Sequence, residues 1–160
     1  MLIGANDAPV DIDRRGASTQ FAVTPLPESA AAAAGDTPRT YLNVTDIEGS
    51  RKPGVIFGVY LNLPAGTASD ARDDYLAGIV SFFGIEKTDP HAAGSRQEPH
   101  GMRYTFDVTG LVDRLRAQGQ WDPGRVSVSM LPAVDDDEPE PLGAAVAARV
   151  RVGTFSLYQG

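Results

Sequence analysis

Apolar and polar side chains alternate without a break between Met102 and Val108. The apolar positions are Met102, Tyr104, Phe106 and Val108, and the polar positions between them are Arg103, Thr105 and Asp107. Successive side chains of a β-strand point to opposite faces of the sheet, whereas a helix repeats its apolar face every three or four residues. The two-residue period therefore predicts a strand that turns one face toward a core.

Similar apolar segments recur along the chain, with turn-forming residues between them. The further segments with a strand pattern are residues 41–46, 55–63, 75–85, 125–131, 144–152 and 154–158. In one of these strands we expect Val126, Val128 and Met130 to face the core. Another contains Gly78 and Gly84, and a glycine inside a strand often marks a bulge or a close backbone approach.

One segment, residues 109–118, carries a helical pattern instead. Its apolar stripe consists of Leu111, Val112 and Leu115. Thr109 is of a residue type that caps helix N-termini, and Gly119 is a natural stop. We expect Trp121, which follows directly, to cover the end of this helix.

The first 38 residues have a weaker pattern. Val10 and Ile12 begin a short apolar run, and the turn-like residues 14–18 lead to Phe21 and Val23, which predicts a hairpin. Residues 25–38 contain five consecutive alanines between prolines and are interpreted as a surface loop, because so short a helix is marginal in water. Residues 1–38 thus form an N-terminal hairpin and loop, and residues 39–160 form the main core.

These segments predict an all-β fold, either an antiparallel β-sandwich or a flattened barrel, with about seven to nine strands and one short helix. Helices do not alternate with strands, which argues against a parallel α/β fold. A length of 160 residues suits a single domain, residues 1–160, that buries one core.

Composition excludes several classes of function. The chain has no cysteine, so it has neither disulfides nor thiolate chemistry. A net charge of −7 opposes binding to nucleic acid. No apolar run reaches the roughly 20 residues of a membrane helix, and no signal peptide is recognisable, so we expect a soluble protein, bacterial cytoplasmic or secreted.

Residues that could carry catalysis are few. The two histidines, His91 and His100, lie in a polar loop and are weak candidates for metal ligands, since a tight site needs three or four. The acidic run 135–140 lacks the ligand spacing of a calcium loop, and Asp73-Asp74 is interpreted as a solvated turn. No Gly-x-Ser-x-Gly motif occurs. We therefore expect no catalytic residue and no cofactor in this chain.

The order of the segments resembles the C-terminal domain of tyrosinase and polyphenol oxidase proteins. The resemblance covers residues 40–158 and is carried by four stretches. These are residues 55–62, Val-Ile-Phe-Gly-Val-Tyr-Leu-Asn; residues 74–83, Asp-Tyr-Leu-Ala-Gly-Ile-Val-Ser-Phe-Phe; the helix with the strand that ends in Met130-Leu131-Pro132; and the closing residues 150–158. Residues 1–25 resemble the segment after the catalytic domain in bacterial tyrosinase-like proteins. Ile56 and Gly58 replace a lysine and an aspartate of the family.

This resemblance implies a non-catalytic domain of a copper oxidase. In that family a separate, upstream catalytic domain holds two coppers with six histidines, which this chain cannot supply. The implied partner is that tyrosinase-like catalytic domain, joined to this one before Met1, and the implied role is to shield the dicopper site, which keeps the proenzyme latent, or to aid folding. The alternative is an independent β-sandwich module that binds a small ligand, carbohydrate or protein partner. Neither reading involves nucleic acid or a membrane.

Overall fold

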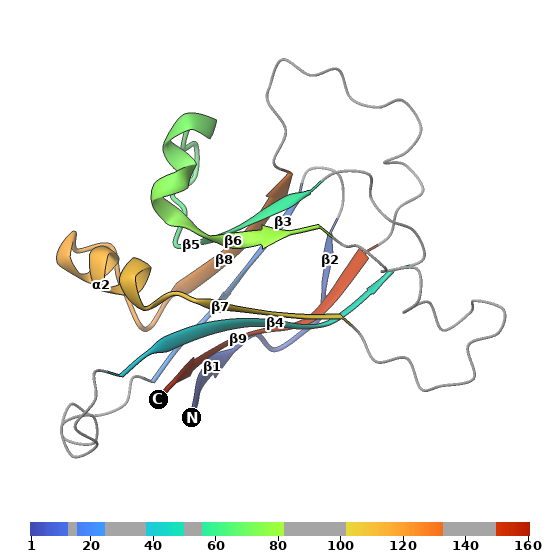
Figure 1. Cartoon of the computed structure of the whole chain (residues 1–160), viewed down its shortest axis with the longest axis horizontal. Coiled ribbons are helices and arrows are strands. Elements are labelled where there is room, and N and C mark those ends of the chain that lie inside the picture. The colour runs from blue at the N-terminus through green and yellow to red at the C-terminus, as the bar shows by residue number, and fades with distance from the viewer. Residues whose placement is uncertain (13–15, 25–37, 50–55, 82–101, 133–149) are drawn as a thin grey trace, which may run out of the picture.

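The computed structural model describes residues 1–12, 16–24, 38–49, 56–81, 102–132 and 150–160 (Figure 1). The strands are β1 (Leu2–Ala5), β2 (Val10–Ile12), β3 (Ala17–Phe21), β4 (Thr40–Gly49), β5 (Phe57–Leu61), β6 (Leu76–Val80), β7 (Met102–Asp107), β8 (Val126–Pro132) and β9 (Val150–Gln159). The helices are the 3-10 helix η1 (Ser69–Tyr75) and the α-helix α2 (Thr109–Ala117). No helix among these residues is long and apolar enough to cross a membrane.

The strands form two antiparallel sheets that lie face to face (Figure 1). Sheet one has the order β1-β9-β4-β7, with β2 also paired to β9, and sheet two has the order β3-β8-β5-β6. Strands β6 and β7 are therefore edge strands, one from each sheet, and they lie near each other along one side of the sandwich. The predicted antiparallel β-sandwich is confirmed, and the described residues contain the one predicted α-helix.

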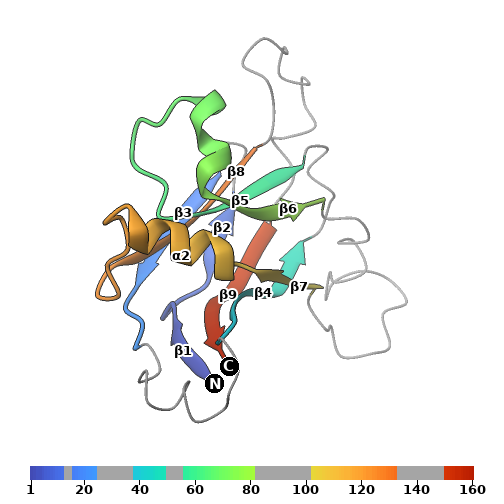
Figure 2. The ribbon, with the colours of Figure 1, turned by 60° about the vertical axis from the view of Figure 1, so that its left-hand side comes forward.

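The core lies between the sheets, and the alternation of the strands decides which side chains enter it. Leu42 and Val44 of β4 are fully buried, as are Val59 of β5 and Val128 of β8. Val126 and Met130 are also buried, so the predicted inward face of this strand is confirmed. Helix α2 lies across one end of the sandwich, where its predicted stripe of Leu111, Val112 and Leu115 is buried (Figure 2).

The predicted N-terminal hairpin is wrong. Val10 of β2 pairs with Val152 in sheet one, whereas Ala17 of β3 pairs with Met130 in sheet two. The chain thus crosses from one sheet to the other between β2 and β3. A two-residue apolar period identifies a strand, but it does not identify the strand's neighbour.

The chain's last residues form one strand, β9, where two strands with a break at Gly153 were predicted. Position 153, inside β9, is a glycine because a side chain would have no room there. A Cβ added at Gly153 would lie 2.6 Å from the Cβ of Asp46. Asp46 itself has a positive φ of 55° at an irregularity in the pairing of β4 with β7. Strand β1, which pairs with β9, was not predicted at all.

Other predictions were wrong in detail or lie outside the described residues. Asp73-Asp74 is exposed, as expected of a solvated segment, but it lies in the 3-10 helix η1. Phe106 is partly buried rather than fully buried, because β7 is an edge strand. The loop at 25–38 lies almost entirely outside the described residues, as do the histidine loop and the acidic run 135–140.

Candidate interaction surfaces

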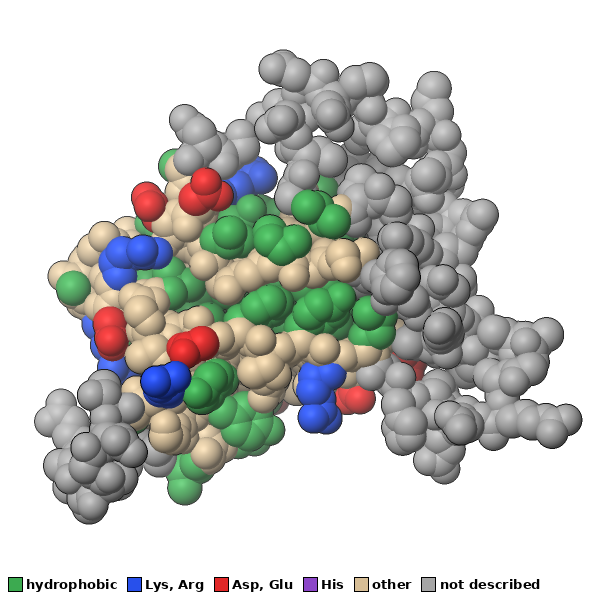
Figure 3. All heavy atoms as spheres, viewed as in Figure 1, with side chains coloured by type: hydrophobic (Ala, Val, Ile, Leu, Met, Phe, Trp, Pro, Cys, Tyr) green, Lys and Arg blue, Asp and Glu red, His purple; other side chains and the backbone are tan. Residues whose placement is uncertain are grey.

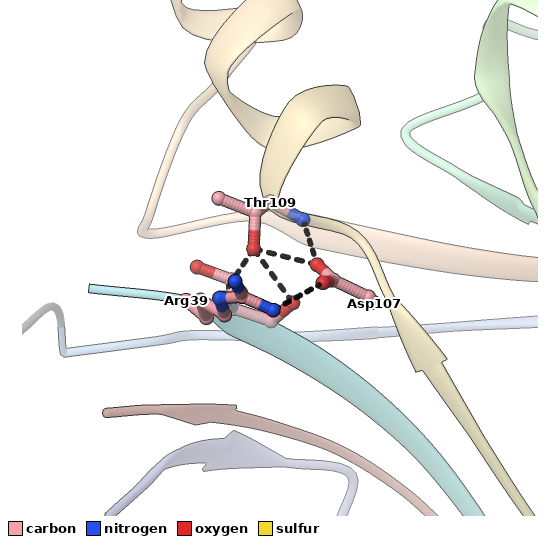
Figure 4. A network of polar contacts seen from close by, with 4 residues as sticks. Arg39, Asp107 and Thr109 are labelled. Atoms are coloured by element: carbon pink, nitrogen blue, oxygen red, sulfur yellow. Dashed lines mark hydrogen bonds and ion pairs between the residues drawn. The ribbon is translucent and has the colours of Figure 1, made fainter. Parts of the chain in front are cut away.

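A polar network at the start of α2 joins three segments of the chain (Figure 4). The Asp107 carboxylate accepts hydrogen bonds from the Thr109 backbone N–H at 3.0 Å and from the Thr109 hydroxyl at 2.6 Å. The Thr109 hydroxyl oxygen also accepts from the Thr40 N–H at 2.9 Å, and the Arg39 guanidinium lies 3.8 Å from the carboxylate. The network therefore fixes the start of β4 against the start of α2.

The predicted cap of α2 is corrected by this arrangement. The Thr109 side chain does not cap the helix, because its hydroxyl is engaged with Asp107 and with the backbone of Thr40. Asp107, two residues earlier, accepts the first helical N–H instead. An acidic side chain at a helix N-terminus also interacts favourably with the helix dipole.

The hydrogen bonds from the Thr109 hydroxyl and backbone lower the pKa of Asp107, and the Arg39 guanidinium lowers it further. Arg39, Asp107, Thr109 and Gly110 line an open hollow of about 540 Å³. Its charged groups are the solvent-exposed ion pair of Arg39 and Asp107, and the Asp107 carboxylate already accepts two hydrogen bonds from Thr109. The hollow therefore offers polar and charged contacts to a ligand or partner.

A row of exposed apolar side chains crosses the outer face of sheet one beside this network. In the strand register Leu2 is opposite Tyr158, Tyr158 is opposite Tyr41, and Tyr41 is opposite Asp107. Leu2 is 50% exposed and Tyr158 is 37% exposed. This row lies where the two ends of the chain meet, since the Gln159 N–H donates to the Met1 carbonyl at 2.9 Å.

A second apolar area lies along the side of the sandwich where the edge strands meet, and we call it the β6–β7 surface. It consists of Leu76, Ala77 and Ile79 from β6 and of Met102, Tyr104 and Phe106 from β7. Ile79 is 44% exposed and the other five are half-buried. Figure 3 shows apolar side chains over both strands, with charged side chains only around them.

The two strands of this surface interlock through Phe106 and Gly78. A Cβ added at Gly78 would lie 2.2 Å from two carbons of the Phe106 ring, so the ring rests on the glycine backbone. The rings of Tyr104 and Phe106 are stacked with centroids 6.2 Å apart. Of the two alternatives expected for a glycine in this strand, a bulge or a close backbone approach, the structure has an irregular register beside Gly78 and an aromatic side chain against it. Aromatic rings thus close this side of the sandwich.

Two features outside these surfaces bear on catalysis. Tyr60 is 6% exposed, and burial raises the pKa of its phenol, with Asp73 contributing in the same direction and Arg72 opposing it. A neutral, covered phenol is not poised as a base at neutral pH. The described part of the chain contains no group of three or more side chains suited to a metal ion, and His91 and His100 lie outside it.

The sequence did not identify these surfaces, although one signal was present. Strand β6 reads Leu-Ala-Gly-Ile-Val, with no charged residue on either face, whereas β7 places Arg103, Thr105 and Asp107 on its outer face. An uncharged strand is usually central in its sheet, so an uncharged strand at an edge indicates a surface that contacts another group. The edge position requires the sheet order, which the sequence alone does not give.

Comparison with known proteins relates the whole chain to one family and to tyrosinases. The family described as a domain of unknown function (DUF7868) matches residues 1–160. Tyrosinase HcTyr1 of Hahella sp. (strain CCB-MM4) is 21% identical over 161 residues, which cover 98% of this chain and 32% of that protein. The chain thus spans about a third of the length of this curated relative.

Solved structures of similar fold come from latent enzymes. Latent aurone synthase (polyphenol oxidase) from natural source matches with a TM-score of 0.52 and 16% identity, covering 96% of this chain and 26% of that protein. The recombinant latent enzyme co-crystallized with hexatungstotellurate(VI) matches with a TM-score of 0.53 and 16% identity, covering 96% and 25%. The resemblance to the C-terminal domain of the tyrosinase and polyphenol oxidase family is confirmed.

Proposed function

Because this chain belongs to the DUF7868 family over its whole length and is similar to one part of a tyrosinase, we propose that it is a non-catalytic domain of a larger tyrosinase-like protein. In that protein it covers the entrance to the copper site and keeps the enzyme latent, or it helps the catalytic part to fold. The observation that carries the proposal is the likeness in fold of 96% of this chain to 26% of a latent polyphenol oxidase.

The chemistry of the described residues supports a covering role over a catalytic one. Tyrosinases are copper enzymes, and the described residues offer no cluster that could hold copper. Copper would therefore be held by the other part of the protein. The 160 residues would act as one unit whose contribution is a surface.

A tethered domain needs only an interface of ordinary size to stay bound over an active site. A specific protein interface usually buries on the order of 1,200–2,000 Å² in total. When two parts are joined by a short linker, the effective concentration of one near the other is about millimolar, so even a weak interface stays closed. A tethered cover can therefore be tight enough for latency and still open under mild treatment.

The experiment compares phenol oxidation by the complete copper-loaded protein and by the same protein without residues 1–160. We expect the shortened protein to be faster if the domain shields the site, or to give a lower yield of folded enzyme if the domain aids folding. Equal rates together with equal yields would contradict both roles and leave an independent binding module. A reading frame without a histidine-bearing catalytic region would contradict the proposal directly.

A further inference from the structure

Strand β6 is an edge strand without the usual protection of edges. Among the described residues it pairs only with β5, and its Leu-Ala-Gly-Ile-Val sequence contains no charge and no proline. Exposed edges present free backbone groups, and natural proteins protect them with charges, prolines or a covering segment. An apolar edge that lacks such protection indicates that another surface covers it.

The other edges differ in this respect. Strand β7 carries Arg103 and Asp107, and β2 carries Asp11. Strand β1 is also uncharged, but its edge is covered, because the Thr24 N–H donates to the Ile3 carbonyl at 2.7 Å. Strand β3 is mostly polar, with Ser18, Thr19 and Gln20. Within the described part of the chain, β6 is thus the apolar edge strand that has no charged residue, no proline and no covering segment.

We propose that the β6–β7 surface is the face on which this domain docks onto the catalytic part of its own tyrosinase-like protein; this rests on the function proposed above. The curated tyrosinase relative has two thirds of its length outside the matched region, which is large enough to supply the facing surface. The facing surface would present apolar side chains rather than charges, because the β6–β7 surface has charges only around it.

A second copy of this chain is a poorer occupant. Each copy carries a net charge of −7, so two copies repel each other at long range. The row of Leu2 and Tyr158 is also a poorer docking face, since the charged pair Arg39–Asp107 lies at its end. An apolar interface centre with charges kept to the rim is better matched by the β6–β7 surface.

The test is hydrogen–deuterium exchange on the complete copper-loaded protein and on the isolated 160-residue chain. We expect slower exchange at residues 76–80 and 102–107 in the complete protein than in the isolated chain. In parallel, Ile79→Lys places a charge on the surface, and Leu2→Lys places one on the alternative row at a similarly exposed apolar position. We expect Ile79→Lys to abolish the added protection and Leu2→Lys to leave it unchanged within twofold.

The outcomes separate the docking face from the proposed function. Added protection around Leu2 and Tyr158, with release by Leu2→Lys, would overturn the β6–β7 face while leaving a covering domain. No added protection anywhere, together with equal phenol oxidation with and without the domain, would overturn both. If the isolated chain dimerises in sedimentation and Ile79→Lys makes it monomeric, the surface is a self-interface and the proposal fails. Ile79→Thr, which keeps the branched side chain, repeats the test if the lysine variant melts at a lower temperature.

Discussion

The exposed Asp107 carboxylate contacts residues of two other segments of the chain. Its oxygen accepts both donors of Thr109, and it lies at the junction of β7, α2 and the start of β4. Hydrogen bonds to a carboxylate favour its ionised form, and so does a nearby guanidinium. The side chain is exposed, so the contribution is local and screened by salt.

The first prediction is the titration of Asp107. Because its pKa is lowered mainly by the Thr109 hydroxyl and backbone hydrogen bonds, we expect its carboxyl to titrate below the ordinary aspartate range. Replacing the hydroxyl in Thr109→Val should raise this pKa, while the smaller effect of Arg39 makes Arg39→Gln shift it less. The measurement is a carbon-13 NMR titration of the Asp107 carboxyl group.

The lowered pKa of Asp107 also makes the stability of the folded chain depend on pH. A carboxyl with a lowered folded pKa contributes stability above its unfolded pKa, and that contribution disappears as the pH falls through the folded pKa. The loss should therefore occur in the acid range, below about pH 4. A Thr109→Val chain whose Asp107 titrates like the wild type would show that the hydroxyl is not the main cause.

Among the elements, β6 and β7 depend on each other through the Phe106 ring and the Gly78 backbone. The ring leaves no space for a side chain at Gly78, and overpacking a well-filled contact usually costs roughly 1–3 kcal/mol. Phe106 is only partly buried, so Phe106→Ala should cost less than the roughly 3–5 kcal/mol of a fully buried aromatic.

The second prediction is a coupling between these two positions. Gly78→Ala should destabilise the chain in the presence of Phe106, and the same substitution should cost much less in a Phe106→Ala background, where the ring is gone. Urea denaturation of the four chains gives the coupling free energy. Additive effects would mean that the ring does not rest on Gly78, and an unchanged stability of Phe106→Ala alone would place the ring away from the core.

Features set by neighbouring residues could be predicted from the sequence, whereas features set by contacts between distant residues could not. The alternation of β7 and the stripe of Leu111, Val112 and Leu115 come from local periods, and both were predicted. The strand neighbours were not, since β2 finds its partner about 140 residues away at Val152. The helix cap was missed because the Thr109 hydroxyl binds Thr40, which is distant in sequence.

The candidate surfaces were beyond the sequence for the same reason. Gly153 was interpreted as a break because nothing local reveals the Asp46 side chain that excludes a Cβ there. The β6–β7 surface exists only because two strands from different sheets both lie at an edge. Sheet order, unlike strand pattern, is a property of the complete fold.

At the scale of the whole molecule, one cluster of buried residues joins both sheets and α2. It includes Leu42 and Leu157 from sheet one, Val59 and Val128 from sheet two, and Leu115 from the helix. Small domains with one continuous core usually unfold in a single cooperative step. A substitution that destabilises one sheet should therefore also lower the unfolding midpoint observed at α2, at the end of the sandwich.

The last prediction concerns this cooperativity, which is also the test of residues 1–160 as one unit. The chain's single tryptophan, Trp121, lies after α2, where the Arg116 guanidinium is 5.8 Å from its ring centroid. Its fluorescence reports the helix end, whereas far-ultraviolet circular dichroism reports the sheets.

Leu157→Ala removes a fully buried side chain from sheet one and should cost roughly 2–5 kcal/mol of the free energy of unfolding. Both probes should then shift to the same lower urea midpoint. The control Thr105→Ala, on the exposed face of β7, should change the free energy of unfolding seen by either probe by at most about 0.5 kcal/mol. If the tryptophan midpoint stayed at its wild-type value while the circular dichroism midpoint fell, the helix end would unfold separately from the sheets, and residues 1–160 would not be one unit.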